Sequence, residues 1–195
     1  MEKVEMSWTR PLLPAHQRIF TRADLKRFLS EDLRAHGYSR WGFHLRLVRP
    51  QLHYQRLLRR TEYWQVQDGI VARVLYVYWR VLLARQSQRL GLSIPPGVFG
   101  PGLSVAHYGS IVVNDKARFG ANCRLHVNTS IGERHGIAPQ GGDDVYVAPG
   151  AVLYGDIRIG SGAVIGANAV VRADVPGNVT VAGVPAKVIA DRNGT

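Results

Sequence analysis

Apolar residues recur at helical spacing through the first half of the chain. The first apolar face lies between a capping-box-like start, Thr21 with Asp24 three residues later, and Gly37, a glycine placed to end the helix. A second helix is expected to begin at Pro50, and a third carries a wide apolar face. The three faces consist of Leu25, Phe28, Leu29 and Leu33; of Leu52, Leu57 and Leu58; and of Val71, Val74, Leu75, Tyr78, Val81, Leu82 and Leu90.

In the second half, large apolar residues recur every six residues. The run breaks twice, by two extra residues at 106–112 and by a longer insertion between Ile131 and Val147. Gly or Ala usually follows the repeating residue, and a small or apolar residue such as Cys123 stands four positions after it. The repeating positions are Phe99, Val105, Val113, Phe119, Leu125, Ile131, Val147, Leu153, Ile159, Ile165 and Val171.

A period of six fits neither an α-helix nor a flat β-sheet. It fits a three-sided prism in which each face uses six residues, the repeating side chain points inward and a small residue turns the corner. The sequence therefore predicts an α+β protein, with a helical N-terminal domain over residues 1–92 and a β-helix over residues 93–195. A loop insertion is expected at about 133–144, and Cys123 is expected to be a small core residue.

Charge is divided unequally between these two parts. The net charge of the chain is +11, and residues 1–92 hold 17 Lys and Arg against 7 Asp and Glu, whereas residues 93–195 hold 8 against 7. This distribution argues against nucleic acid as the partner. Arg56, Arg59 and Arg60 are expected on a solvated, salt-bridged helix surface, the alternative being an attraction for phosphate-bearing substrates or an acidic polymer.

Composition indicates a globular chain, with 46% hydrophobic and 20% charged residues among 195. One cysteine excludes a disulfide framework and a cysteine-only zinc site. The N-terminus shows no signal-peptide pattern, and the most apolar stretch, residues 70–84, is too short to span a bilayer and carries two arginines. A cytoplasmic protein without a transmembrane segment is expected.

Two stretches of sequence add a resemblance to this pattern. They are Ile94-Pro-Pro-Gly-Val-Phe-Gly-Pro-Gly-Leu-Ser-Val-Ala-His-Tyr-Gly-Ser-Ile-Val-Val-Asn114 and Ala182-Gly-Val-Pro-Ala-Lys-Val-Ile189. With the repeats, they resemble the hexapeptide-repeat acyltransferases, whose fold is a left-handed parallel β-helix. The resemblance covers roughly residues 50–190 and is strongest to the serine acetyltransferase-like branch, above all to bacterial O-acetyltransferases of capsule, lipopolysaccharide and other glycans. It implies acetyl-coenzyme A as the donor and a hydroxyl group as the acceptor.

The chemistry of this transfer points to one histidine. Attack of an alcohol on a thioester needs a base for the hydroxyl proton and an N–H donor for the oxyanion. Imidazole suits the first task because its unperturbed pKa is about 6.5. His107 lies where the six-residue register breaks, next to Tyr108 and Gly109, and it matches the catalytic histidine of the branch. We predict that His107 is the general base.

Two positions depart from serine acetyltransferases. In those enzymes one aspartate orients the catalytic histidine and another, just before it, helps to hold the amino acid, and Leu92 and Ala106 occupy these positions here. Without both carboxylates, a serine ammonium group loses its natural partners. The sequence therefore favours a sugar or glycan hydroxyl, as in surface polysaccharide biosynthesis. Serine O-acetylation for cysteine biosynthesis and a non-catalytic β-helix scaffold are the alternatives, and a basic binder of nucleic acid or membrane surfaces ranks third.

Four further residues are candidates for the acceptor side. His126 follows His107 by nineteen residues, close to one coil of about eighteen, so it either faces the same cleft or is a surface histidine. Arg134 and His135 open the insertion, where serine acetyltransferases have an Arg-His pair further along their loop; a solvated loop arginine is the alternative. Asp32 either orients His107 from the helical segment or is a charge on the helix surface.

The resemblance also implies where the donor binds. In this superfamily the pantetheine arm lies in a groove along the coils, held mostly by backbone groups, between two subunits of a trimer. The turn residues nearest the arm are then Glu133, Pro149 and Ala167, and Lys187 is placed to meet the phosphates of coenzyme A. A homotrimer, alone or paired into a hexamer, is expected, with the insertion arching over the neighbour's cleft. No metal is expected, because the histidine pair five residues apart of the zinc-binding relatives is absent.

Overall fold

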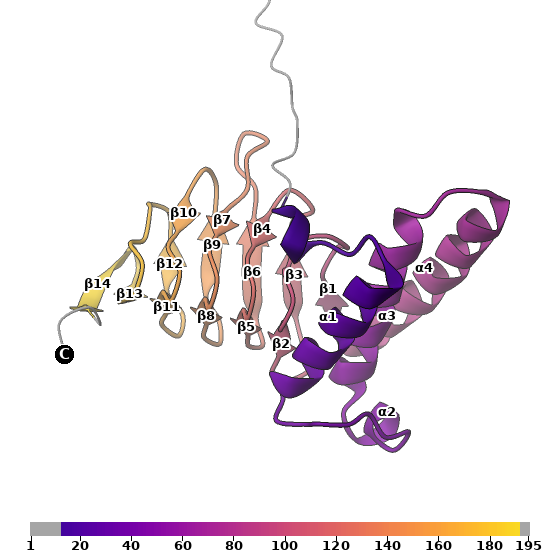
Figure 1. The fold of residues 1–195 in the computed structure, drawn as a ribbon. Coiled ribbons are helices and arrows are strands. Elements are labelled where there is room, and N and C mark those ends of the chain that lie inside the picture. The colour runs from indigo at the N-terminus through magenta and orange to yellow at the C-terminus, as the bar shows by residue number, and fades with distance from the viewer. Residues whose placement is uncertain (1–12, 192–195) are drawn as a thin grey trace, which may run out of the picture.

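Helices occupy one end of the molecule and a stack of β-coils forms the rest (Figure 1). The structure is a computed structural model that describes residues 13–191. The helices are η1 (Ala15–Gln17), α1 (Arg22–Arg34), α2 (Leu45–Val48), α3 (Pro50–Gln65) and α4 (Ile70–Leu90). The strands are β1 (Leu92–Ser93), β2 (Ser104–Val105), β3 (Ile111–Val113), β4 (Arg118–Phe119), β5 (Arg124–Leu125), β6 (Thr129–Gly132), β7 (Gln140–Gly141), β8 (Tyr146–Val147), β9 (Val152–Tyr154), β10 (Arg158–Ile159), β11 (Val164–Ile165), β12 (Val170–Val171), β13 (Val179–Gly183) and β14 (Ala186–Asp191).

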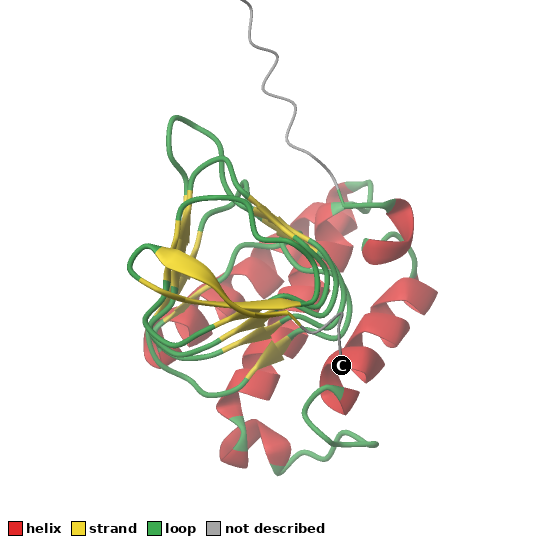
Figure 2. Ribbon diagram, turned by 90° about the vertical axis from the view of Figure 1, so that its left-hand side faces the viewer, coloured by secondary structure: helices red, strands yellow, loops and turns green. Residues whose placement is uncertain are grey.

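Three sheets form the faces of a prism, which Figure 2 shows end-on. The first face has the order β1-β3-β6-β9-β12, the second β10-β7-β4 and the third β14-β13-β11-β8-β5-β2. From β2 to β12, successive strands fall on successive faces. All neighbours pair in parallel except β13 and β14, which form an antiparallel hairpin at the far end. The expected helical segment followed by a parallel β-helix is therefore confirmed.

The interior of the prism follows the six-residue repeat. All eleven predicted positions are buried, none more than 4% exposed, and Cys123 lies among them. Burial raises the pKa of the Cys123 thiol to about 12, which fits its expected role as an inert core residue. One rung of the prism was not predicted from the sequence. Gly141 pairs with Phe119 on the second face, and a side chain at Gly141 would collide with the Phe119 ring, which fills that space. The predicted insertion is thus interrupted by a regular rung, β7.

Helices α1 and α3 begin where the sequence predicts, and α1 ends close to the predicted stop. Thr21 and Asp24 form a capping box at the start of α1, and the N–H of Gly37 donates to the carbonyl of Arg34 just beyond its end. Pro50 is the first residue of α3. Helix α3 packs against α1, α2 and α4, and Tyr54, Leu57 and Leu58 join one continuous core with the interior of the prism.

Polar side chains of α3 fasten it to the first coil. The hydroxyl of Tyr54 accepts the N–H of Ile94 and donates to its carbonyl, at 3.2 and 3.1 Å. The guanidinium of Arg59 donates to the carbonyls of Phe99 and Gly100, at 2.9 and 2.7 Å. The α3 side chains thus supply bonds that a preceding coil would supply inside the stack.

Arg59 is buried, so the expectation that it lies on a solvated helix surface was wrong. Its side chain is 0% exposed and donates to Asp32 at 2.8 and 3.1 Å and to Glu62 at 3.0 and 3.3 Å. Burial alone would lower its pKa, but the charges of Asp32 and Glu62 outweigh burial and raise the pKa of Arg59 above its ordinary value. Arg56 and Arg60 lie instead at the surface of the helices, over the rings of Trp41 and Trp79.

The apolar face expected for α4 is only partly buried. Helix α4 buries Ala72 and Leu83, whereas four of the predicted face residues are exposed. Their exposed fractions are 66% for Val71, 64% for Val74, 53% for Tyr78 and 45% for Val81. Within residues 13–191, no helix combines the length and the apolar character that crossing a membrane requires.

Candidate active site

His107 lies on an exposed edge of the prism, where the chain turns from the third face to the first. Val105, Leu125, Val147 and Ile165 are in register on the third face. The residues two positions after them are His107, Val127, Pro149 and Ala167, so these four follow one another along this edge. His107, Pro149 and Ala167 are all exposed. The predicted base and two of the predicted donor-side residues therefore share one edge.

Two glutamines of α3 hold the strand that leads to His107. The Gln55 amide donates to the carbonyl of Leu103 at 2.5 Å, and its oxygen accepts the N–H of Val105 at 3.4 Å. The Gln51 amide donates to the carbonyl of Ala106, at 3.4 Å. The Gln51 carbonyl oxygen is buried and has no hydrogen-bond partner within residues 13–191. The backbone immediately before His107 is thus fixed by the helical segment.

A cluster of polar side chains lies beside His107 on the third face. The guanidinium of Arg124 lies 3.4 Å from the Nε2 atom of His126, and its Nη1 donates to the Ser104 hydroxyl at 3.4 Å. The ring of His126 packs against the ring of Tyr146, with 5.1 Å between centroids. Burial lowers the pKa of His126, and the charges of Arg124 and His107 lower it further. His126 therefore faces the same surface as His107, which was one of the two readings of its position.

His36 reaches this cluster from the loop that follows α1. Its Nε2 atom lies 2.9 Å from the Gln55 carbonyl oxygen. Burial lowers the pKa of His36, while Gln55 and Asp32 oppose the shift and Arg124 adds to it. Helical residues therefore form one wall beside the strand that leads to His107.

The other acceptor candidates do not join His107 within one chain. Asp32 is 4% exposed, ion-paired with Arg59, and its carboxylate accepts the N–H of Leu103 at 3.0 Å, so it stabilises the junction between α1 and the first coil. Arg134 and His135 lie where the first face turns into the second, and they line a separate pocket of about 390 Å³ with Tyr154, Asp156 and Arg172. They are therefore separated from His107 by a face of the prism.

The remaining donor candidates are also spread over the molecule. Glu133 lies at the same edge as Arg134 and forms an ion pair with Lys116 at 2.8 Å. Lys187 is exposed on β14 in the terminal hairpin. Leu92 and Ala106, the positions that carry aspartates in serine acetyltransferases, are 1% and 8% exposed, so no charged group replaces those aspartates in place.

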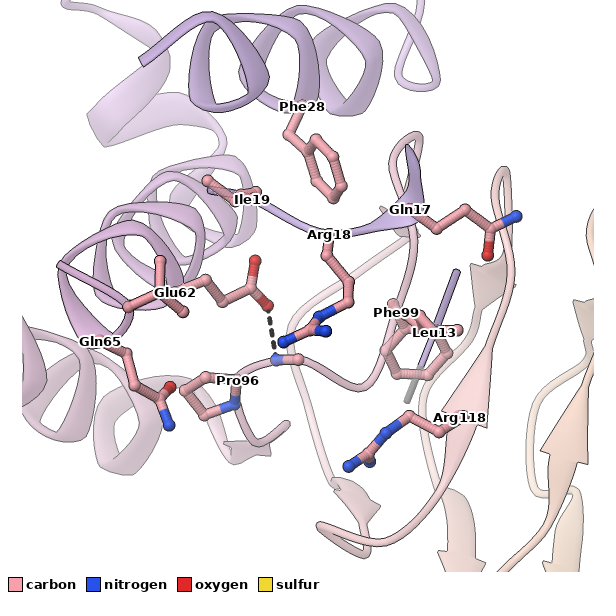
Figure 3. A pocket seen from close by; sticks show the side chains of 12 residues that line it. Leu13, Gln17, Arg18, Ile19, Phe28, Glu62, Gln65, Pro96, Phe99 and Arg118 are labelled. Carbon is pink, nitrogen blue, oxygen red and sulfur yellow. Dashed lines mark hydrogen bonds between the residues drawn. The ribbon is translucent and has the colours of Figure 1, made fainter. Parts of the chain in front are cut away.

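A cavity of about 190 Å³ lies between the segment that leads into α1, helix α3 and the first coil (Figure 3). Arg18, Glu62 and Arg118 line it, and the Glu62 carboxylate accepts the N–H of Gly97 at 2.8 Å. Pockets for small ligands usually measure about 300–1,000 Å³. No predicted site residue lines this cavity, so it is not the candidate active site.

Sequence reasoning missed the two glutamines that hold the backbone before His107. Gln51 and Gln55 lie four residues apart on α3, so they share one face of the helix with Arg59, a further four residues on, and this polar row is a signal that could have been recognised. Arg124 and Tyr146 point outward from two neighbouring rungs of the third face. Their register could be predicted only with the rung at Gly141 in place, because that rung determines the number of residues per coil.

Comparisons with known proteins agree with this fold. Residues 142–173 match the family described as Bacterial transferase hexapeptide (six repeats). A serine acetyltransferase of Staphylococcus epidermidis is 32% identical over 137 residues, which cover 64% of this chain and 63% of the relative. The chain therefore spans less than two thirds of the length of this relative.

Two solved structures extend the comparison. The serine acetyltransferase of Neisseria gonorrhoeae in complex with serine is 29% identical, with a TM-score of 0.69 over 87% of this chain and 70% of that one. A serine acetyltransferase in complex with CoA is 22% identical, with a TM-score of 0.67 over 86% of this chain and 70% of that one, and at this identity it shows the fold alone.

These relatives correct the acceptor that the sequence favoured. The absence of carboxylates at Leu92 and Ala106 suggested a sugar or glycan hydroxyl and a role in polysaccharide biosynthesis, but the matching proteins are named serine acetyltransferase. The expectation of a glycan acceptor was wrong, and the serine alternative fits better. The chain thus carries the hexapeptide repeat of bacterial transferases and is similar, in sequence and in fold, to serine acetyltransferases.

Proposed function

We propose that this protein transfers the acetyl group of acetyl-coenzyme A to the hydroxyl group of L-serine, with His107 as the general base. The observation that carries the proposal is the position of His107. It stands on an exposed edge of a rigid prism, and the same edge carries, two and three coils farther along, turn residues that the family resemblance assigns to the donor, in a chain similar to serine acetyltransferases.

The proposed reaction needs no covalent enzyme intermediate. His107 takes the hydroxyl proton while the serine oxygen attacks the thioester carbonyl, and a backbone N–H of the coils stabilises the oxyanion. Collapse of this intermediate breaks the carbon–sulfur bond. The coenzyme thiolate leaves and takes the proton from the His107 imidazolium, which restores the base. The two glutamines of α3 keep the backbone before His107 fixed throughout.

The donor site is proposed along the edge that His107 shares with Pro149 and Ala167. Both residues are exposed and have short side chains, so a pantetheine arm can approach the backbone of the coils there. In this arrangement the phosphates extend towards the terminal hairpin, where Lys187 is exposed. Coenzyme A therefore fits the residues present on this edge.

A homotrimer is part of the proposal. Within one chain, Glu133, Arg134 and His135 lie on a different edge from His107, so they can complete the site only next to another copy. Mixed oligomers of a His107→Ala chain and an Arg134→Ala chain test this arrangement. Activity should recover when the two inactive chains are mixed, because some clefts then receive both native residues. No recovery on mixing two inactive chains would contradict a shared cleft.

The reaction is tested by release of free thiol from acetyl-coenzyme A. The native chain should release thiol when L-serine is added, and His107→Ala should lose at least about a hundredfold in turnover. His16→Ala is the matched control, because His16 is an exposed histidine in the helical segment. A non-catalytic scaffold predicts no thiol release with any acceptor, and an unchanged rate in His107→Ala would exclude that residue as the base.

A further inference from the structure

We infer that Arg124 is the acceptor-binding residue that holds the carboxylate of the substrate beside His107. This inference rests on the proposed function and names the group by which the acceptor is selected. No property of the sequence repeat requires an arginine at this position, since the outward residues of the neighbouring rungs are Ser104 and Tyr146.

The position of Arg124 places its charge next to the reacting group. Arg124 lies on β5 and points outward, in register with Ser104, which precedes His107 by three residues. Its guanidinium bridges Ser104 and His126, each at 3.4 Å. His126 in turn interacts electrostatically with His107. A substrate whose hydroxyl contacts His107 therefore has Arg124 and His126 within the length of a small molecule.

Arg124 is available to bind an anion. Its side chain is exposed, and no Asp or Glu pairs with it among residues 13–191. Both of its hydrogen bonds are long for charge-assisted contacts, which measure about 2.7–2.9 Å to a carboxylate. A carboxylate that accepts two parallel N–H bonds from the planar guanidinium would form stronger bonds than these.

The side chains around Arg124 do not neutralise its positive charge. The positive charge of Arg124 reaches His126 on one side and His36 on the other, since it lowers the pKa of both. Arg49 also acts on His36 and donates to the Tyr38 hydroxyl at 3.2 Å. Asp32, the carboxylate that acts on His36, is bound by Arg59. An anionic group entering between these side chains is therefore attracted, and an ammonium group is not.

The apolar positions Leu92 and Ala106 lead to the same conclusion. Both are buried and uncharged, so neither offers a carboxylate to an ammonium group. The site should therefore recognise the carboxylate and the hydroxyl of serine and depend little on its ammonium group. L-Glycerate has the same carboxylate and hydroxymethyl group with a hydroxyl in place of the ammonium, and it should be acetylated as well. L-Serinamide, which lacks the carboxylate, should be a poor acceptor.

The experiment measures kcat and KM of thiol release for L-serine, L-glycerate and L-serinamide. Arg124→Gln should raise KM at least about tenfold for the two carboxylates while kcat changes less than about threefold, because a charge-assisted bond is lost in the ground state and in the transition state alike. KM for L-serinamide should not change. Arg158→Gln is the control, since Arg158 is an exposed arginine on the second face, and Arg124→Lys should recover part of the affinity as a single point charge.

Two results would overturn the inference. One is a wild-type chain that acetylates L-serinamide as well as L-serine; the other is an Arg124→Gln variant with unchanged KM for both carboxylates. Calorimetric binding of L-glycerate to the wild-type chain and to Arg124→Gln separates this inference from the proposed function. Absence of turnover in every chain would refute the acetyl transfer alone, whereas equal L-glycerate binding with and without Arg124 would refute the carboxylate site.

Discussion

The largest loss of stability is predicted for removal of the buried guanidinium of Arg59. Arg59→Met keeps most of the apolar stem and removes the charged group. It also removes the bonds to Asp32 and Glu62 and to the carbonyls of Phe99 and Gly100, the shortest of which measure 2.7–2.8 Å. Two carboxylates only 4% and 7% exposed would then lose their counter-charge.

The size of the effect follows from the uncompensated charges. Removing one partner of a buried ion pair costs about 3–5 kcal/mol, against about 5–15 kcal/mol for the whole free energy of unfolding of a typical domain. For a chain of this size each kcal/mol lowers the thermal midpoint by about 2–4 °C, so the midpoint should fall by about 6–20 °C. The loss should be smaller at pH 5 than at pH 8, because burial raises the pKa of Glu62 and protonation then neutralises this carboxylate in the variant.

Urea denaturation followed by tryptophan fluorescence, at one protein concentration, measures this loss. Arg60→Met is the control, because Arg60 contacts the ring of Trp79 at 4.9 Å near the surface and should cost no more than about 1 kcal/mol. Equal effects of the two substitutions would refute the reasoning. Asp32→Asn should likewise lower stability but leave kcat/KM for L-serine nearly unchanged, which distinguishes a role at the junction from a role in acceptor binding.

Two further predictions concern the coils and the helical segment. Gly160→Ala should lower the free energy of unfolding by more than about 1 kcal/mol, because the new methyl group would collide with the backbone of Gly177. Gly132→Ala is the control and should be tolerated, because only ordinary contacts surround Gly132. Equal thermal midpoints of the two variants would contradict this prediction. Burial and the charges of Arg46 and two other arginines lower the pKa of half-buried His53 to about 4. In the unfolded chain His53 takes up a proton from about pH 6.5, so the stability of the folded chain should fall as the pH drops from about 6.5 to 4. His53→Gln should make the denaturation midpoint less dependent on pH in that range. An unaltered pH profile would contradict the lowered pKa of His53.

The repeat made most of the fold predictable from the sequence. Each interior residue, such as Leu125 or Ile165, must be apolar because the prism leaves no room for water, and this requirement produces the six-residue period. The rung at Gly141 was not recognised in the sequence, because position 141 has no apolar side chain. The ring of Phe119, from the coil before it, fills the space that a side chain at position 141 would occupy. Such compensation between coils cannot be seen along one chain.

The helical segment was harder to predict because tertiary contacts determine which faces are buried. Arg59 was assigned to a solvated face, but α3 lies against the open end of the prism, where unpaired backbone carbonyls need donors. In α4, Val74 and Tyr78 follow the apolar period yet are exposed, because the helix packs on α3 through its other side. Periodicity identifies an apolar face but not the element that covers it.

The candidate site, too, could be predicted from the sequence only in part. The break in the repeat placed His107 on an edge, and the register of the coils placed Pro149 and Ala167 on the same edge. The acceptor was misjudged, because the absence of two carboxylates removes one means of holding serine without showing what replaces it. The polar cluster around Arg124 became visible only when rungs twenty residues apart were paired in space.

A crystal structure of the chain with coenzyme A and L-serine tests the central claim most directly. The serine hydroxyl should lie within about 2.6–3.2 Å of a ring nitrogen of His107, with the coenzyme sulfur about 3–3.5 Å from that hydroxyl. A sulfur atom bound on another edge of the prism, farther from His107 than one bridging water can span, would contradict it.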